Sequence, residues 1–482
     1  MIDCTRFAQT VDGKPVAVFG LGRSGMSTVK ALCKAGVTVK AWDDNDAQCK
    51  EAEKHGAQCV KLDENELKDC ACLVLAPGVP LHFPEPHPVV EAARAADVEI
   101  ICDLEVLHRC GHGRKTIGIT GTNGKSTTTA LITHILQNAG RDVVMGGNIG
   151  EPALDMKLPK KKDGIIVLEI SSYQMDLCPT FRPDIAVLLN ITPDHLDRHG
   201  TFENYIESKT RIFENDGSEE GLAVIGTDDE PCQKIYERLI AFELGKRRTR
   251  PISSKSQTED GIYIEESVLY DTRNGLHEER QSLKGLTALR GLHNHQNAAA
   301  AYAVCISKDI GLSVEEVFEG LNSYPGLPHR QKQIRVINGI PYIDDSKATN
   351  AEAASKAVSS YDRIYWIAGG RAKSDGLEGL QSLLPRIHHA YLIGEAMEEF
   401  AVWLDQYSTP YSLCGDMQKA VQEAHEDAQN ERGQPGGGGV VLLSPACASW
   451  DQYESFEHRG RHFEELVMAL DDGEKSEAGG KA

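Results

Sequence analysis

The clearest chemical signal in the sequence is a glycine-rich loop between an apolar segment, expected to be a strand, and an expected helix. It reads Gly121-Thr122-Asn123-Gly124-Lys125-Ser126-Thr127. Glycines let successive N–H groups point into one cavity, and the amino end of the helix adds positive potential. Lys125 would reach the β- and γ-phosphates, and Ser126 would bind Mg²⁺. The loop therefore predicts a nucleoside triphosphate site. It is a shorter variant of the G-x-x-x-x-G-K-S/T pattern, because Ile119 stands six positions before the lysine.

A second glycine motif lies near the start of the chain. Gly20-Leu21-Gly22-Arg23-Ser24-Gly25 follows an apolar run and matches G-x-G-x-x-G, with Asp43 about twenty residues further on. Alone it indicates NAD, and the plainer alternative is a tight strand-to-helix turn. A dehydrogenase has no use for ATP, so with the triphosphate loop in the same chain we favour the diphosphate of a nucleotide-linked substrate.

Two further side chains are candidates for metal chemistry, and a third residue, Lys209, is not marked by its local pattern. Glu169 ends an apolar segment, where a carboxylate beside a phosphate loop would ligate Mg²⁺ or its water; pairing with a surface lysine is the alternative. His195 follows another apolar segment and would serve a second metal or be an ordinary histidine at the start of a helix. Lys209, in a helical stretch, fits the pattern of a solvated lysine.

Polar groups also gather at expected helix starts and strand ends in the second half of the chain. Asn294 and Asn297 begin an alanine-rich helix, where their amides would contact an adenine or ribose, or cap the helix. DDSKATN (344–350), GGRAKSDG (369–376) and SPACASWDQYESFEHRG (444–460) each follow an expected strand. Three such turns predict a ligand crevice at the strand ends.

The elements that must position these groups alternate between strand and helix, which predicts an α/β protein of three domains. We expect a Rossmann-like domain over residues 1–112, a central P-loop ATPase domain with a mostly parallel sheet over 113–328, and a second Rossmann-like domain over 329–470. The polar stretch 246–284 should be peripheral and contain a hairpin at 261–271. The tail 471–482 should be disordered.

Composition narrows the function further. The 482 residues hold 51 Lys+Arg against 72 Asp+Glu, a formal charge of −21, which disfavours general nucleic-acid or membrane-surface binding. The 13 cysteines contain no C-x-x-C pair, which is typical of reduced thiols rather than disulfides or a zinc site. The first residues lack the pattern of a secretory signal, and no apolar run approaches the roughly 20 residues of a spanning helix. We expect a cytoplasmic protein without membrane insertion.

Taken together, the motifs resemble the Mur ligases of peptidoglycan assembly. GTNGKST, LEISSYQ, LNITPDHLDRH, LHNHQNAAAA, GLPHR, DDSKATN and SPACASWDQYESFEHRG occur in the family order, from about residue 16 to 466. FGLGRSG and the last two motifs look most like the branch that adds D-glutamate. The resemblance implies an N-terminal domain for the UDP-sugar, a central ATPase domain and a C-terminal domain that closes on ATP and the amino acid.

The resemblance also implies the chemistry. ATP would phosphorylate the carboxylate of UDP-N-acetylmuramoyl-L-alanine, and the amine of D-glutamate would attack the acyl phosphate, giving an amide, ADP and phosphate. Two Mg²⁺ ions would assist, and the protein would be a monomer with small-molecule partners.

Site residues carry over by motif. Lys125, His195 and Lys209 would be catalytic; Ser126 and Glu169 would serve the first Mg²⁺, and His195 the second, together with Lys209 as a carbamylated lysine. The ATP contacts would be residues 121–127, Asn294, Arg330 and Asp345. The UDP-substrate contacts would be Gly20, Gly22, Arg23, Ser24, Asp43, Ala76, Pro77, Gly78 and Asn148. The D-glutamate contacts would be Thr349, Lys373, Ser449 and Phe456.

Four alternatives stay open on the sequence. One is a Mur ligase that adds L-alanine, a diamino acid or a dipeptide. A folylpolyglutamate synthase is disfavoured, because its ATP loop lies near the start of the chain whereas about 110 residues precede this one. From other classes, an NAD-dependent dehydrogenase would change nicotinamide absorbance, and a nucleotide-gated regulator would bind ATP without substrate-dependent release of ADP.

Overall fold

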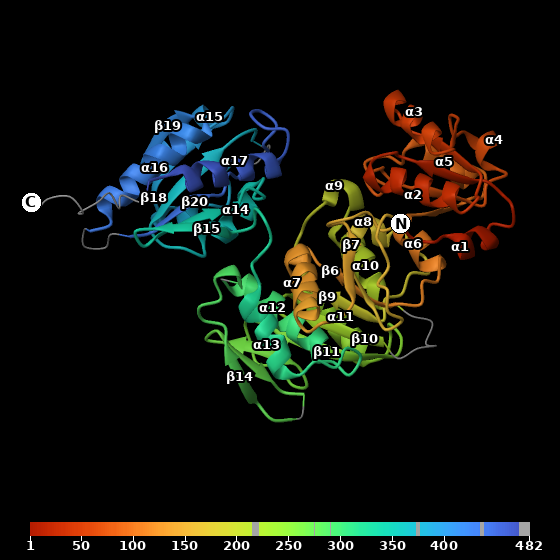
Figure 1. The fold of residues 1–482 in the computed structure, drawn as a ribbon, viewed down its shortest axis with the longest axis horizontal. Helices are drawn as coiled ribbons and strands as arrows, with labels where there is room; N and C mark the ends of the chain where they lie inside the picture. Colours follow the sequence, from red (N-terminus) through yellow and green to blue (C-terminus); the bar gives the residue numbers. More distant parts are fainter. Residues whose placement is uncertain (215–220, 274, 290, 373–375, 434–437, 472–482) are drawn as a thin grey trace, which may run out of the picture. The chain divides into compact units, whose positions relative to one another are not determined.

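The computed structural model describes residues 1–471 apart from 215–220, 274, 290, 373–375 and 434–437. It divides into two compact units, one of Met1–Lys284 with Asn294–Tyr324 and one of Gly285–His293 with Pro325–Ala482. Strands and helices alternate along the chain, as the sequence predicts for an α/β protein (Figure 1). The strands form three sheets, two in the first unit and one in the second.

The first sheet is parallel, with strand order β3-β2-β1-β4-β5. Its strands are β1 (Val16–Phe19), β2 (Val39–Trp42), β3 (Gln58–Cys59), β4 (Cys72–Leu75) and β5 (Glu99–Ile101). Its helices are α1 (Thr5–Thr10), α2 (Arg23–Lys34), α3 (Asp46–Lys54), α4 (Glu64–Leu67), α5 (Pro88–Ala95) and α6 (Asp103–Arg109). Because the chain winds outward in both directions from β1, the turns after β1 and β4 flank a switch point, where open α/β sheets bind ligands. The glycine motif at 20–25 follows β1 and leads into α2 of a β-α-β unit, as expected for a Rossmann-like domain.

The central sheet has nine strands in the order β14-β13-β12-β11-β10-β9-β6-β8-β7. They are β6 (Lys115–Thr120), β7 (Val143–Gly147), β8 (Ile165–Glu169), β9 (Ile185–Leu188), β10 (Gly221–Gly226), β11 (Arg247–Ser253), β12 (Ile262–Glu265), β13 (Val268–Asp271) and β14 (Glu278–Ser282). The helical segments in this part of the chain are α7 (Lys125–Asn138), α8 (Ser172–Met175), α9 (Leu196–His199), α10 (Phe202–Thr210), η1 (Arg211–Phe213), α11 (Glu230–Ile240), η2 (Thr287–Leu289), α12 (Leu292–Cys305) and α13 (Val314–Ser323). The predicted hairpin at 261–271 is confirmed as β12 and β13, and it extends this sheet at one edge.

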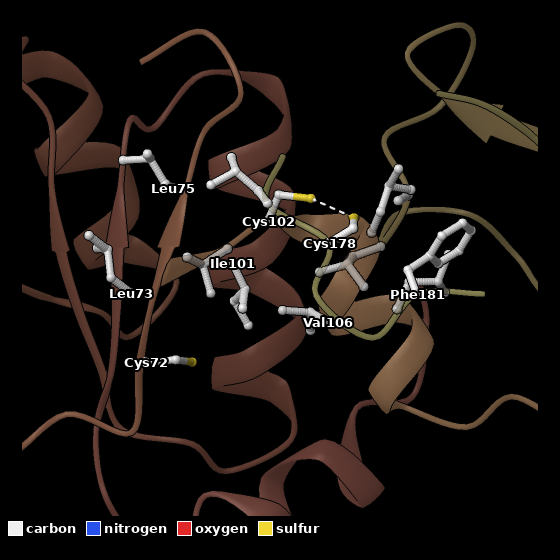
Figure 2. Packing of buried hydrophobic residues seen from close by; sticks show 14 of the residues in the cluster. Cys72, Leu73, Leu75, Ile101, Cys102, Val106, Cys178 and Phe181 are labelled. Carbon is white, nitrogen blue, oxygen red and sulfur yellow. Dashed lines mark hydrogen bonds between the residues drawn. The ribbon is translucent and has the colours of Figure 1, made fainter. Parts of the chain in front are cut away.

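The first and central sheets are joined by a buried seam. Cys102, which precedes α6, and Cys178, which follows α8, bring their Sγ atoms to 3.4 Å among apolar side chains (Figure 2). Beside them the carboxylate of Glu105, fully buried, accepts the N–H groups of Thr180 at 3.1 Å and Phe181 at 2.9 Å. A buried carboxylate needs such partners, so the seam ties the two sheets into one unit. The domain boundary at residue 112 stays a prediction.

The third sheet has the order β15-β16-β20-β17-β18-β19, with β15 antiparallel and the others parallel. Its strands are β15 (Lys332–Ile337), β16 (Ile340–Asp344), β17 (Ile364–Gly369), β18 (Ile387–Ile393), β19 (Tyr411–Gly415) and β20 (Val440–Leu443). Its helical segments are α14 (Ala351–Val358), η3 (Gln381–Arg386), α15 (Met397–Gln406), α16 (Met417–Glu431) and α17 (Phe456–Ala469). Since β16, β20 and β17 are parallel neighbours, the polar turns that follow them meet at one edge, as predicted. Within the described ranges, no helix combines the length and apolarity needed to span a bilayer.

Candidate active site

The glycine loop after β6 has the backbone that its sequence predicts. Gly121 and Gly124 have φ angles of +149° and +86°, and Gly124 precedes the first residue of α7. A Cβ on Gly124 would lie 2.3 Å from Oδ1 of Asn297, so the position has no room for a side chain. Glycine alone fits this turn, which leaves the amino end of a 14-residue helix facing the loop.

Two lysines meet at one carbonyl of this loop. Nζ of Lys125 donates to the carbonyl oxygens of Gly121 and Thr122, both at 2.8 Å. Nζ of Lys209, from α10, donates to the same Gly121 oxygen at 2.9 Å. Lys209 is only 1% exposed, so the solvated lysine that the helical pattern predicts is wrong. The reason is its place on α10, one turn after Tyr205, which is also buried.

Burial changes the pKa of the Lys209 amine. Desolvation lowers the pKa of its amine well below the usual value, and repulsion from Lys125 lowers it further, while the carboxylates of Asp194 and Asp176 oppose the shift. The ring of Tyr205 lies 4.6 Å from Nζ, and its hydroxyl is 3.1 Å from Oγ1 of Thr122. Burial beside the phosphate loop therefore favours the neutral form of this amine over its ammonium form.

His195 is close enough to Lys125 and Lys209 to interact with their charges. It has a left-handed backbone, with φ of +54°, and directly precedes α9. Its side chain is about half exposed, and Nε2 lies 3.5 Å from Oδ2 of Asp194. Desolvation lowers the pKa of the imidazole, and the charges of Lys125 and Lys209 add to the shift. A neutral imidazole has the lone pair that metal ligation requires.

Glu169 ends β8 directly beside β6, where Ile119 is its register partner. The side chain is buried, and Oε1 accepts from Nδ2 of Asn148 at 3.0 Å. Oε2 is buried without a hydrogen-bond partner among the described residues. A buried carboxylate oxygen without a donor is costly, and a cation would satisfy it. Asn148, which the resemblance assigns to the UDP-substrate, thus also orients Glu169.

Magnesium would need further ligands at this site. Among the residues that the structure describes, no three His, Cys, Asp or Glu side chains are grouped so as to hold a metal. Mg²⁺ commonly binds through one or two carboxylates, with phosphate oxygens and waters completing its shell. The donor set around Glu169, with Ser126 at the start of α7, fits that mode.

An amide network that the sequence reasoning missed supports the loop from β9. Oδ1 of Asn190 accepts the N–H of Asn123 at 2.9 Å, and its Nδ2 donates to the Asn123 carbonyl at 3.2 Å and to Oε1 of Gln296 at 2.8 Å. On α12, Asn297 accepts from Thr128 at 3.1 Å and donates to Oδ1 of Asn294 at 3.0 Å. The amides on α12 therefore contact α7 and each other. The position of Asn190 just after an apolar strand was the available signal.

We expect Asn190→Ala to raise the KM for ATP about tenfold with a smaller change in kcat. The substitution removes two hydrogen bonds to the backbone of Asn123 and leaves the amide of Gln296 with one partner fewer, a loss of roughly 1–3 kcal/mol. Initial rates against ATP concentration measure the effect. Gln296→Ala, which keeps both bonds to Asn123, is the matched control and should change KM less; equal effects would contradict a direct role of Asn190.

The predicted UDP-substrate residues lie at the switch point of the first sheet. Gly20, Gly22, Arg23 and Ser24 follow β1, Ala76, Pro77 and Gly78 follow β4, and Asp43 follows β2. Oδ2 of Asp43 accepts the N–H of Leu21 at 2.5 Å. Nη2 of Arg23 donates to the carbonyl of Gly150 at 2.7 Å, and Nη1 of Arg198 donates to that of Gly78 at 2.8 Å. The structure thus brings both turns beside the loops that carry Asn148 and His195.

Most of the predicted residues of the second unit lie after β16 and β20. Oδ2 of Asp345 accepts from the hydroxyl of Ser444 at 2.8 Å, and Oδ1 accepts the N–H of Gln331 at 3.2 Å. The ring of Phe456, at the start of α17, lies 3.8 Å from Nζ of Lys347. Arg330 is exposed before β15, while Thr349 and Ser449 occupy the turns after β16 and β20. Lys373 lies outside the described residues.

Arg459 is a buried cation that the sequence reasoning missed. It is 1% exposed and donates to Oγ of Ser346 at 2.9 Å, to the Ser346 carbonyl at 2.8 Å and to the Cys447 carbonyl at 3.0 Å. Burial lowers the pKa of its guanidinium to about 10. These hydrogen bonds join the turn after β16 to the turn after β20. The position of Arg459 on α17 does not predict them from the sequence.

We expect the free energy of unfolding to depend on pH through the carboxyl group of Asp345. Burial raises the pKa of its carboxyl from 3.8 to about 7. Between these values the unfolded chain has released the proton and the folded chain still holds it, so the free energy of unfolding falls as pH rises and levels off above about 7. Urea unfolding from pH 4.5 to 8 measures this slope. Asp345→Asn, which cannot titrate, should lack it; the same slope in both proteins would contradict the assignment.

Two family models match the chain. The Mur ligase middle domain matches residues 119–305, and the Mur ligase MurD-like, N-terminal domain matches residues 14–102. The chain is 47% identical to the UDP-N-acetylmuramoylalanine–D-glutamate ligase of a Chelativorans species, over 96% of this chain and 97% of the relative. It is 46% identical to the ligase of the same name from Agrobacterium fabrum, over 98% of this chain and 97% of the relative.

Solved structures share the fold at low identity. MurF from Acinetobacter baumannii superimposes with a TM-score of 0.57 at 16% identity, covering 96% of this chain and 99% of its own. UDP-N-acetylmuramate-alanine ligase from Thermotoga maritima gives a TM-score of 0.55 at 17% identity, covering 94% and 99%. At these identities the likeness concerns the fold.

Proposed function

The chain belongs to the UDP-N-acetylmuramoylalanine–D-glutamate ligase family of Mur ligases, and on that premise we propose how its residues perform the family reaction. The protein is an ATP-dependent ligase of peptidoglycan precursor synthesis that joins D-glutamate to UDP-N-acetylmuramoyl-L-alanine. The observation that carries the proposal is that Lys125 and Lys209 both bond to the Gly121 carbonyl, at the end of the strand next to Glu169, whose Oε2 has no hydrogen-bond partner within the described part of the chain. We further propose that it acts as a cytoplasmic monomer.

The first chemical step is phosphoryl transfer. A carboxylate oxygen of the acceptor substrate attacks the γ-phosphorus of ATP, the bond to the β,γ-bridging oxygen breaks, and ADP leaves. Such a transfer needs positioning and charge neutralisation more than covalent help. Lys125 neutralises the transferring phosphoryl group, and the N–H groups of the glycine loop hold the other phosphates. We assign Asn294, Arg330 and Asp345 to the nucleotide as well.

Magnesium has identifiable ligands in this chain. Glu169 and Ser126 would hold one ion, and His195 would hold a second together with a modified Lys209. When bound, the ions would neutralise charge on the phosphate oxygens. Asn148 keeps Glu169 oriented through the bond to Oε1.

Lys209 is suited to carbamylation. Its neutral nitrogen attacks the carbon of CO₂, a proton is lost from the nitrogen, and the lysine becomes a carbamate with a negative charge. The neutral amine that this reaction requires follows from the burial of Lys209 and from the charge of Lys125. The carbamate would sit opposite that cation in the loop, where opposite charges attract.

The second step forms the amide. The neutral amine of D-glutamate attacks the carbonyl carbon of the acyl phosphate, the nitrogen loses a proton to solvent, and phosphate leaves from the tetrahedral intermediate as the C–O bond breaks. D-glutamate is a dianion, so its site needs cationic and hydroxyl donors. We assign Thr349, Lys373, Ser449 and Phe456 to it, and the turns after β1 and β4 to the uridine diphosphate. Arg459 positions the D-glutamate turns through its bonds to Ser346 and Cys447.

An amino-acid panel tests the function. Purified protein is given ATP, Mg²⁺, bicarbonate and UDP-N-acetylmuramoyl-L-alanine, with one amino acid at a time, and phosphate release and the new amide are measured. Only D-glutamate should give both products in equal amounts. A preference for L-alanine, a diamino acid or a dipeptide would identify a different Mur ligase. In a parallel assay with NAD⁺ or NADH added, a change in nicotinamide absorbance without ADP would identify a dehydrogenase.

A further inference from the structure

We propose that the chain carries a second anion site, a pocket for a small tetrahedral oxyanion such as orthophosphate, between β10, β11 and the carboxyl end of α12. The cavity has a volume of about 170 Å³. Its polar lining consists of Arg248, Arg250, Arg273, Lys308 and Ser307. The inference does not depend on the ligase reaction, because it concerns the binding of an ion away from the glycine loop.

The spacing of the lining residues along β11 and α12 places them on one side of each element. Arg248 and Arg250 are two residues apart on β11, so their side chains leave the same face of the strand. Ala303 and Ser307 are four apart at the end of α12, which places them one above the other on one side of the helix. All four side chains line the same cavity, so the cations of the strand face the hydroxyl of Ser307.

Two buried donors in this pocket have no acceptor among the residues that the structure describes. Ser307 is 7% exposed, and its Oγ makes no hydrogen bond with any residue that the structure describes. Nε of Arg248 is likewise buried and unbonded within the described ranges. Leaving such a group unsatisfied costs roughly 1–3 kcal/mol. A ligand rich in acceptors would satisfy both, and an oxyanion offers acceptors on every side.

The cations that line the cavity exceed the carboxylates paired with them by one charge. Three carboxylates face the lining cations: Asp309 pairs with Arg248 at 2.6 Å, Asp260 with Arg250 at 2.5 Å, and Asp271 with Arg273 at 2.6 Å. Asp271 is further engaged by Arg280 at 3.6 Å and by the hydroxyl of Tyr302 at 3.1 Å. Lys308 adds a positive charge for which the described residues show no ion pair. Four lining cations thus face three carboxylates, in a protein whose formal charge is −21.

Size and position separate this pocket from the nucleotide site. Its volume is below the roughly 300–1,000 Å³ of pockets for drug-sized ligands, so it suits an ion rather than a nucleotide. Leu222 and Arg248 are the second residues of the parallel strands β10 and β11, at their amino ends. The glycine loop follows the carboxyl end of β6, which is parallel to these strands through β9. The pocket therefore lies near the amino ends of the parallel strands of the central sheet, and the glycine loop lies at their carboxyl ends.

Calorimetric titration with orthophosphate tests the proposal, using the full chain with ADP and Mg²⁺ at saturation to fill the glycine loop. We expect one bound phosphate, weakened at least tenfold in Arg250→Gln, which loses a lining cation whose partner Asp260 is largely exposed. Ala303→Leu, which fills the cavity, should weaken binding similarly. Arg238→Gln, a change of an exposed arginine on α11, should alter it less than twofold. Circular dichroism establishes that each variant is folded.

Three other outcomes would contradict the proposal. They concern the kind of phosphate that binds, the place where it binds, and whether it binds at all. Phenyl phosphate, which carries the phosphoryl group on a larger body, should bind at least tenfold more weakly than orthophosphate; tighter binding would overturn the assignment to a free ion. Phosphate binding that disappears in Lys125→Ala and is unchanged in Arg250→Gln and Ala303→Leu would place the ion in the glycine loop. Absence of binding at tens of millimolar phosphate would also overturn the proposal.

Discussion

Lys125→Ala is expected to lower kcat by at least about a thousandfold while the protein remains folded. The ammonium is the positive charge nearest the phosphates in our assignment, and removal of one such group from a preorganised site costs about a hundred- to a thousandfold or more. The side chain is only half buried, and its amine bonds to two carbonyls of its own loop, so its removal leaves little empty volume. Initial rates of phosphate release at saturating substrates measure the loss.

Lys115→Ala is the matched control for that variant. Lys115 begins β6, the strand that ends at the glycine loop, and its Nζ donates to the carbonyl of Asp309 at 2.7 Å. Its loss should change thermal stability slightly and leave kcat within about twofold, as expected for a position away from the chemistry. Near-normal kcat in Lys125→Ala, with the control unchanged, would remove Lys125 from the mechanism.

Lys209→Ala is expected to lose at least about a hundredfold in kcat, and short carboxylates such as acetate should restore part of the activity. The truncation leaves a buried space beside Gly121 and Tyr205 that a carboxylate can enter, where it takes the place of the carbamate. The loss is of the size expected when an electrostatic group of a preorganised site is removed. Rates with and without acetate, at constant ionic strength, measure the rescue.

Lys209→Met separates the charge of that residue from its volume. The methionine side chain fills most of the space of the lysine, so acetate should not restore activity in this variant. In the unsubstituted protein, ¹³C-labelled bicarbonate should give a carbamate signal in NMR spectra that both variants lack. Unchanged activity of Lys209→Ala, or equal rescue of the two variants, would contradict the assignment.

Local patterns in the sequence were sufficient for the elements and for the turns that carry the site. The apolar run and glycine turn before α2, and the same arrangement before α7, predicted β1 and β6 because strand propensity and glycine turns act over a few residues. Glu169 was predicted at the end of a strand for the same reason. The strand order within each sheet brings the carboxyl ends of these strands together. That order follows from the way the chain connects parallel strands.

What local patterns could not predict depends on contacts far apart in the chain. Lys209 is buried because α10 packs against a loop 88 positions earlier, and nothing within the helix distinguishes it from a solvated lysine. Asn190 and Gln296 pair across 106 positions. Arg459 is buried by turns more than 100 positions before it as well as by a near neighbour. Such partners are known only once the sheets have assembled.

The seam between the first and central sheets limits where this chain can be divided into fragments. A fragment ending at residue 112 would keep Glu105 and Cys102 but lose Thr180, Phe181 and Cys178, which now cover them. The surface newly exposed on it would hold a carboxylate that has lost two backbone N–H donors and keeps only its bond to Arg109, next to an apolar thiol. Such a surface is unfavourable for an independent protein in water. The smallest piece that keeps this surface covered must therefore extend past residue 181, and exchange of N-terminal segments between related enzymes would have to carry both sides of the seam together.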